Sequence, residues 1–176
     1  MNSKTFICLI FCAALTIFGC SKDNSARQSA SDLSNASAAT QVSGVGFIYA
    51  DDPCDAVGQG AAFALTLTGD LEGCDYFFID EFECSPSGTY REKGRELFVG
   101  TYKGQSGTFR TTYRFEGKYE GCPENGEPLG AEIFGRCQHP IVEGSGTGIF
   151  EGITGRFNFI DDIEAGNYPY KGHLKF

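Results

Sequence analysis

Basic residues, histidine and tryptophan are scarce in this chain of 176 residues. It has 14 Lys and Arg against 23 Asp and Glu, and the formal net charge of −9 argues against nucleic acid as a partner. Only 2 His and no Trp are present, so there is little room for histidine-based catalysis or metal binding. No Ser-His-Asp set, HExxH, P-loop or CxxC motif occurs in the sequence. We therefore expect no catalytic residue, metal site or cofactor.

The longest apolar run lies at the N-terminus, from Phe6 to Phe18. It is too short to cross a bilayer as a stable helix, but it has the length of the apolar region of a signal peptide. It leads into Ile17-Phe18-Gly19-Cys20, which resembles the bacterial lipobox in its aliphatic residue, its small residue directly before the Cys and the Cys itself. The resemblance implies cleavage before Cys20 and acylation of the new N-terminus and of the Cys20 thiol.

Lipidation of Cys20 implies that a lipid bilayer is a partner of the protein. The residue after the Cys is Ser21, whereas an Asp there would resemble an inner-membrane retention signal. The resemblance therefore favours an outer-membrane lipoprotein of a bacterial envelope, on either face of that membrane. The alternative is an ordinary secreted protein in which Gly-Cys occurs by chance. We expect residues 1–19 to be a lipoprotein signal peptide.

The segment that follows Cys20 is poor in apolar residues. Residues 21–43 contain 7 Ser and 5 Ala and no aromatic residue. Such a composition cannot bury enough apolar surface to offset the entropy lost on ordering. We expect residues 20–43 to form a disordered tether, and residues 44–176, which hold all 8 Tyr, to form one folded domain.

Apolar and polar residues alternate with a period of two in this domain. In Thr108–Glu120 every second residue is aromatic or small and the residues between them are polar or charged, which is typical of a strand with one buried face. Turn-forming pairs such as Lys93-Gly94 separate the candidate strands, and Lys103–Gly107 is expected to be a hairpin loop. The other candidate strands are 45–50, 63–72, 74–83, 88–93, 95–102, 129–138, 145–151, 155–162 and 170–176.

Eight to ten short strands and no segment of helical period predict an all-β domain, either a barrel or a sandwich. Glycines inside strands, such as Gly117 and Gly172, favour the bends that barrel closure requires. The expected fold is therefore a single antiparallel up-and-down barrel of about eight strands, with a sandwich as the alternative.

One stretch carries a family resemblance. The motif Gly148-Ile149-Phe150-Glu151-Gly152-x-x-Gly155 is similar to one in plant allene oxide cyclases, and looser forms occur in dirigent proteins and in bacterial β-barrel domains. The resemblance implies an eight-stranded, calycin-like barrel in which the motif forms a structural hairpin. It transfers no catalytic residue, because no position of this chain matches the catalytic residues of the cyclases.

Three side chains are candidate ligand-binding residues. Asp80 shares its alternation with Phe82, which would place a carboxyl inside the barrel. The opposite face, with Phe77, is equally apolar, so a solvent-facing Asp80 is the alternative. Tyr113 lies on the aromatic face of its strand, and Arg136 is either a ligand-binding cation or a surface residue.

Five cysteines follow the lipobox. Export to an oxidising compartment predicts disulfides, and an odd number leaves at least one thiol free or paired between chains. Cys74 and Cys84 bracket one candidate strand and are roughly 33 Å apart, so they are not expected to pair. Up-and-down topology favours a Cys54–Cys84 bond and places Cys74 near Cys122. Cys137 then remains as a buried free thiol.

These features favour a binding module over an enzyme. We expect a non-catalytic barrel that binds a small apolar or aromatic ligand, or a protein partner. One alternative is a structural envelope or adhesion domain whose barrel is filled by side chains. The other is a cyclase or isomerase that acts on a lipid-like substrate, which a carboxyl with a polar partner deep in a cavity would favour.

Overall fold

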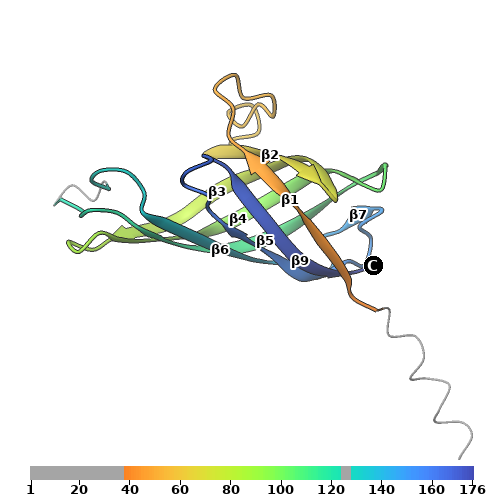
Figure 1. Cartoon of the computed structure of the whole chain (residues 1–176). Coiled ribbons are helices and arrows are strands. Elements are labelled where there is room, and N and C mark those ends of the chain that lie inside the picture. The colour runs from red at the N-terminus through yellow and green to blue at the C-terminus, as the bar shows by residue number, and fades with distance from the viewer. Residues whose placement is uncertain (1–37, 124–127) are drawn as a thin grey trace, which may run out of the picture. The chain divides into compact units, whose positions relative to one another are not determined.

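The chain folds entirely into strands and loops over the residues that the structure describes. The computed structural model describes residues 38–123 and 128–176, so the expected signal peptide, Cys20 and the part of the expected tether before residue 38 lie outside the described residues. No helix occurs in the described ranges, and the all-β prediction is confirmed (Figure 1). The strands are β1 (Thr40–Phe47), β2 (Phe63–Gly69), β3 (Leu71–Cys84), β4 (Thr89–Tyr102), β5 (Gln105–Lys118), β6 (Phe134–Pro140), β7 (Thr147–Gly148), β8 (Thr154–Ile160) and β9 (Tyr168–Lys175).

Eight of these strands close into an antiparallel barrel. The order around it is β4-β3-β2-β1-β9-β8-β6-β5, and β5 pairs with β4 to complete the ring. β1 starts before residue 44 and pairs with β9, so that Thr40 lies opposite Leu174. The short strand β7 belongs to the connection between β6 and β8 and pairs with β5 at Gly107. The expected up-and-down barrel is confirmed, with one additional strand.

The alternation along β5 separates the barrel interior from solvent. Phe109 and Tyr113 are buried, whereas Arg110 and Arg114 are exposed. The same separation on the other strands creates one aromatic and aliphatic core inside the barrel. Its fully buried members include Leu71, Phe98, Phe109, Phe150, Ile153, Phe157, Tyr170 and Leu174.

Three strands are longer than the others and extend one side of the barrel wall (Figure 1). β3, β4 and β5 have 14 residues each, whereas β2, β6 and β8 have 7. The candidate strands 88–93 and 95–102 are thus one strand, and the expected turn at Lys93-Gly94 is wrong. Gly94 lies opposite Tyr113, and a Cβ atom at Gly94 would lie 2.7 Å from the Tyr113 ring. Glycine is needed there because the tyrosine ring crosses the strand.

The β4–β5 connection is tighter than the expected loop Lys103–Gly107. Only Lys103 and Gly104 lie between the two strands, with φ angles of 51° and 75°. Positive φ at both central residues is the geometry of a two-residue hairpin turn that matches strand twist.

The motif at 148–155 closes the end of the barrel that holds this turn. Gly152 has a φ of 75° and turns the chain between β7 and β8. The expected hairpin is wrong, because β7 pairs with β5 whereas β8 pairs with β6 and β9. The turn holds Phe150 inside the barrel, where it is fully buried. Its ring lies 5.0 Å from that of Phe109 and 5.7 Å from that of Phe98 between centroids. The motif therefore fills this end with aromatic side chains.

The β1–β2 loop covers the outer face of the barrel and carries the first disulfide. Cys54 in this loop is bonded to Cys74, with 5.6 Å between their Cα atoms. The expected Cys54–Cys84 bond is wrong, because the loop packs against the outside of β2 and β3 near Cys74 and does not stay at the barrel end. Tyr76, on the outer face of β3, packs with Cys54 in a second hydrophobic cluster, which is separate from the core inside the barrel. The cluster explains why both faces of β3 are apolar.

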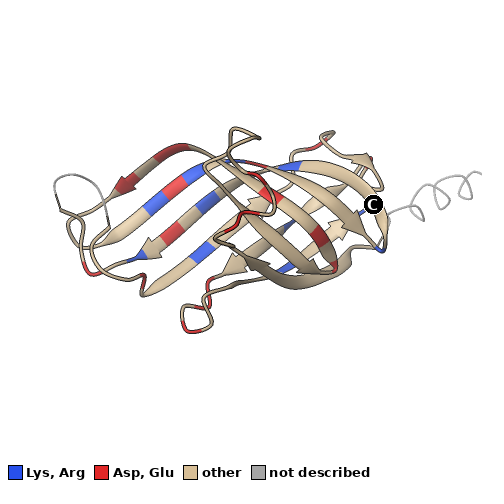
Figure 2. Ribbon diagram, turned by 90° about the horizontal axis from the view of Figure 1, so that it is seen from above, with Lys and Arg blue, Asp and Glu red and all other residues tan. Residues whose placement is uncertain are grey.

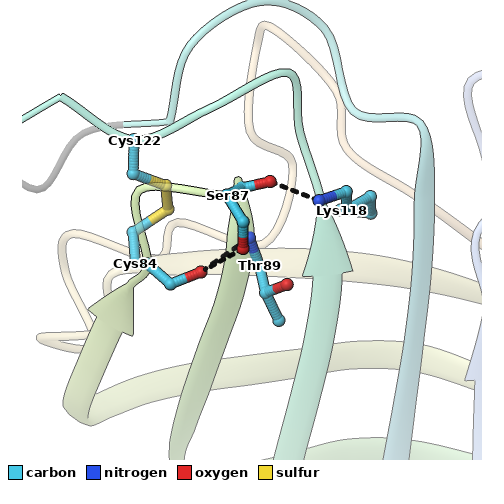
Figure 3. The surroundings of a disulfide bond; sticks show 6 residues. Cys84, Ser87, Thr89, Lys118 and Cys122 are labelled. Atoms are coloured by element: carbon cyan, nitrogen blue, oxygen red, sulfur yellow. Dashed lines mark hydrogen bonds between the residues drawn. A yellow bond between two sulfur atoms is a disulfide. The ribbon is translucent and has the colours of Figure 1, made fainter.

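The second disulfide joins Cys84, at the end of β3, to Cys122, in the β5–β6 loop (Figure 3). The Cα atoms are 5.7 Å apart. Lys118 donates a hydrogen bond through Nζ to the carbonyl of Ser87 in the β3–β4 turn beside it (Figure 3). The expected proximity of Cys74 and Cys122 is wrong. Disulfide formation, the absence of a Cys74–Cys84 bond and the free, buried thiol of Cys137 are confirmed.

We expect non-reducing peptide mapping to recover two linked peptide pairs, one with Cys54 and Cys74 and one with Cys84 and Cys122. Burial raises the pKa of the Cys137 thiol, so this residue should react with an alkylating agent much more slowly in the folded than in the unfolded protein. Equal rates of alkylation in the two states would contradict its placement inside the barrel.

Candidate functional site

A cavity of about 320 Å³ occupies the barrel interior at the end where β3, β4 and β5 extend. Aromatic and aliphatic side chains form most of its wall, as is usual for small-molecule sites. The interior is thus filled at the end of the 148–155 motif and hollow at the other. The lining residues are Ile48, Phe63, Leu65, Phe77, Phe82, Tyr90, Glu92, Tyr113, Phe115, Tyr119, Pro128, Glu132, Cys137, His139, Phe159, Asp161 and Tyr168.

Glu92 of β4 places a carboxylate in the cavity wall. Tyr113 of β5 donates a hydrogen bond to Oε1 at 2.6 Å, and Tyr90 donates one to Oε2 at 2.6 Å. Burial, followed by the hydrogen bond to Glu92, raises the pKa of Tyr113. The Tyr113 hydroxyl therefore stays protonated and remains a donor, and the two tyrosines fix the orientation of the Glu92 carboxylate.

His139 of β6 and Glu96 of β4 form a buried polar pair beside the cavity. The Nδ1 atom of His139 lies 2.7 Å from the Glu96 carboxyl, which also accepts a hydrogen bond from the Thr111 hydroxyl. Burial raises the pKa of Glu96 to about 8 and lowers that of His139 to about 4. Burial therefore favours the neutral form of both groups, the protonated acid and the neutral imidazole.

The His139 ring borders the cavity between two other aromatic rings. It stacks on Phe157 at 5.2 Å and on Tyr113 at 6.1 Å between centroids. Its Nε2 atom is fully buried and has no hydrogen-bond partner among the described residues. A buried polar atom without a partner in a protein interior is a feature that calls for a ligand or water.

A second buried acid lies near this pair. Asp75 of β3 is 1% exposed, and neither carboxyl oxygen has a partner in the described part of the chain. Burial raises its pKa, the charge of Glu96 adds to this, and His139 opposes it. Burial therefore favours the protonated form of Asp75 over its carboxylate.

Two more acids, Glu132 and Asp161, stand at the rim of the cavity. Burial and the neighbouring Glu132 raise the pKa of Asp161 to about 7. Tyr119 donates a hydrogen bond to Glu132 Oε2 at 3.3 Å. The acids share the rim with tyrosine hydroxyls, so both hydrogen-bond acceptors and donors face the opening.

The expectation that Asp80 faces the interior is wrong. The register between β3 and β4 shifts between Ile79 and Glu81, and this bulge reverses the alternation. Phe82 therefore enters the cavity, whereas Asp80 lies on the outer face and pairs with Arg95 at 2.8 Å. This hydrogen-bonded pair lowers the pKa of Asp80.

Arg136 also lies outside the cavity. Of the two interpretations of this residue, the surface cation is the one that the structure supports. Its guanidinium pairs with Glu116 at 2.9 Å on the outer face of the extended wall, where charges of both signs are placed side by side (Figure 2). Of the three candidate residues, only Tyr113 lines the cavity. The other ion pairs of this face are Arg91–Glu83, Arg91–Glu116 and Lys93–Glu81.

Sequence reasoning missed Glu92 and Glu96. A signal for both was present, because residues 92, 94, 96 and 98 alternate with outward-facing residues and end in Phe98. The interpretation of Lys93-Gly94 as a turn divided this strand and concealed the pattern. With Gly94 inside a strand, both acids share the inward face of Phe98.

Comparisons of this chain with models of protein families, with curated proteins and with solved structures find no match. Within residues 38–123 and 128–176, no helix has the length and apolar character needed to cross a membrane. Functional inference therefore depends on the geometry of the cavity.

We expect the free energy of unfolding to fall as the pH rises from 6.5 to 8. Glu96 has a pKa of about 8 when folded and an ordinary value of 4.5, so its contribution is complete below pH 4.5 and is lost as the pH rises through 8. His139 acts oppositely, but only between about pH 4 and its ordinary value of 6.5. The pKa values of Asp75 and Asp161 are raised as well, so both acids change the free energy of unfolding in the same direction as Glu96. The quantity to compare is therefore the pH dependence of the free energy of unfolding in the native chain and in Glu96→Gln.

Chemical unfolding at several pH values measures this difference. One proton corresponds to about 1.4 kcal/mol per pH unit, so Glu96→Gln should remove up to about 2 kcal/mol of the decline between pH 6.5 and 8. Parallel curves for the two proteins would show that Glu96 is ionised in the folded state.

Proposed function

We propose that the barrel binds a small, mainly apolar or aromatic molecule in the cavity at its extended end. The observation that carries the proposal is the cavity of about 320 Å³ whose walls are aromatic and whose few polar groups converge on it. A barrel with a purely structural role can be filled by side chains throughout. Here bulky side chains fill one end, and the other end is left open to a ligand.

A cavity-filling substitution tests this proposal. Cys137 lines the cavity and its thiol is free, so Cys137→Phe places a ring in the space that the ligand needs. Native mass spectrometry of the protein purified from its own host should show a bound small molecule, and Cys137→Phe should lose most of it. Ile160→Phe on the outer face, where Ile160 is 63% exposed, is the control and should retain the ligand. Equal occupancy in both variants would contradict binding in the cavity.

A cyclase or isomerase is the second candidate, favoured by the buried acid–imidazole pair. Glu96 holds a proton beside neutral His139, and His139 borders the cavity. Such a pair can donate and accept a proton near a bound substrate. The test is turnover: an enzyme converts the co-purified molecule on prolonged incubation, and Glu96→Gln abolishes conversion without abolishing binding.

We further propose that the protein is anchored in the bacterial outer membrane through acylated Cys20. The proposal is supported by the sequence Ile17-Phe18-Gly19-Cys20 after an apolar run, and by two disulfides, which fit an exported chain. We expect globomycin to cause the precursor to accumulate and Cys20→Ser to remain without lipid. Unchanged processing under the drug would contradict the proposal.

A further inference from the structure

We infer that the ligand is an organic cation, an amine with an apolar body, and that Glu92 is its counter-ion. This inference rests on the proposed function, since it names the class of molecule that the cavity binds. It starts from the charged groups that line the cavity.

The charge of the cavity is of one sign. Among the residues that the structure describes, its lining contains the acids Glu92, Glu132 and Asp161 and no Lys or Arg. His139 adds no positive charge at neutral pH, because burial lowers its pKa to about 4. An anionic ligand would be desolvated beside carboxylates with no cation to compensate, whereas a cation finds its partner in place.

The basic residues of the extended wall cannot supply the missing positive charge. Arg95 and Arg136 point to the outer face and are engaged by Asp80 and Glu116 at 2.8 Å and 2.9 Å. They belong to β4 and β6, which also carry cavity residues, but they lie at the exposed positions that alternate with the buried, inward-facing ones. Because successive side chains of a strand point to opposite faces of the sheet, the acids that line the cavity and these basic residues lie on different faces.

Glu92 is the acid best prepared to pair with a cation. Its two oxygens accept hydrogen bonds from Tyr113 and Tyr90, both at 2.6 Å, which hold the carboxylate in one orientation. A carboxylate oxygen accepts more than one hydrogen bond, so both oxygens retain capacity for a ligand ammonium group. Orientation before binding lowers the entropy lost when the ligand pairs with it.

Aromatic rings surround the position next to Glu92. The Tyr90 ring lies 6.0 Å from that of Phe82, 6.1 Å from that of Phe115 and 6.0 Å from that of Tyr119 between centroids. All four rings line the cavity. The faces of aromatic rings attract cations, and several rings beside a carboxylate are the usual environment of a bound ammonium group.

Sets of compounds that share one apolar body test the inference. The first set is tryptamine, tryptophol and indole-3-propionate, which carry an ammonium, a hydroxyl and a carboxylate on the same indolylethyl group. The second is phenethylamine, 2-phenylethanol and 3-phenylpropionate, and the third is octylamine, octanol and nonanoate. Isothermal titration of the full mature chain at neutral pH and low salt measures each affinity. In every set that binds, the amine should bind at least about tenfold more tightly than the alcohol, and the acid most weakly.

Substitution of the counter-ion gives the second measurement. Glu92→Gln keeps an oxygen that accepts from the two tyrosines, and it should weaken amine binding by about tenfold while changing alcohol binding by less than about twofold. Glu83→Gln is the matched control, because Glu83 is on the outer face of the same wall with 73% of its side chain exposed. This control should leave all affinities unchanged.

The possible outcomes distinguish a failure of the proposed function from a failure of the inference that the ligand is a cation. Binding of no compound from any set would overturn the proposed function itself. Binding in which alcohol or acid equals the amine would leave the cavity as a binding site and overturn the inference of a cation. An amine preference that survives Glu92→Gln would overturn the assignment of Glu92 as the counter-ion.

Discussion

Replacement of Phe150 by alanine is expected to destabilise the protein by about 3 to 5 kcal/mol, the usual cost of truncating a buried phenylalanine. Phe150 is fully buried at the filled end of the barrel, with the rings of Phe98 and Phe109 against it. The loss combines transfer of the ring to water with the void that remains, because strands closed into a barrel cannot collapse freely onto it. The midpoint of urea unfolding, measured without reducing agent, should fall accordingly.

Phe134→Ala is the matched control for this experiment. Phe134 is 42% exposed on the outer face, and its truncation should cost less than about 1 kcal/mol. If Phe150→Ala cost no more than Phe134→Ala, the 148–155 motif would not be the element that fills this end of the barrel.

Removal of the Cys84–Cys122 bond should cost roughly 4 kcal/mol. The bond spans 38 residues, and a cross-link over such a span reduces the entropy of the unfolded chain by this amount in the loop-closure account. The Cys54–Cys74 bond spans 20 residues, for which the same account gives roughly 3 kcal/mol. The comparison is between the native chain and the double variant Cys84→Ser with Cys122→Ser, unfolded in urea.

Reducing agent provides an internal control. Dithiothreitol should destabilise the native chain by the sum of both contributions, but the double variant by that of Cys54–Cys74 alone. If dithiothreitol destabilised the double variant as much as the native chain, the bond between residues 84 and 122 would not contribute in solution. The bond also joins the tip of β3 to the loop after β5, close to cavity residues such as Phe82 and Tyr119, so ligand affinity should fall with it.

The architecture of the barrel was accessible from the sequence because alternation along a strand reports directly which face is buried. β5 is the clearest case, since every inward position from Phe109 to Tyr113 is buried and every outward position is exposed. Failures occurred where a strand departs from simple alternation. The bulge between Ile79 and Glu81 reverses which alternate side chains of β3 face the interior, and the residue types at these positions do not predict it.

The candidate site was harder to predict because it depends on which strands face one another across the barrel. His139 and Glu96 are 43 residues apart in the sequence, and only the closure of the sheet brings them to 2.7 Å. The disulfide pairings failed for a related reason. The path of the β1–β2 loop over the outer face is set by packing of small side chains such as Ala56 and Ala64 against Tyr76, which strand counting does not include.

The pairing of β1 with β9 determines where the barrel is attached to the rest of the chain. Thr40 and Leu174 lie side by side at the end that Phe150 fills, and the cavity opens at the other end. A protein held through residues before Thr40 is therefore held by its closed end. Phe176 lies at the same end, with its ring 6.2 Å from that of Phe150 between centroids. A fusion partner attached there would therefore leave the opening of the cavity unobstructed.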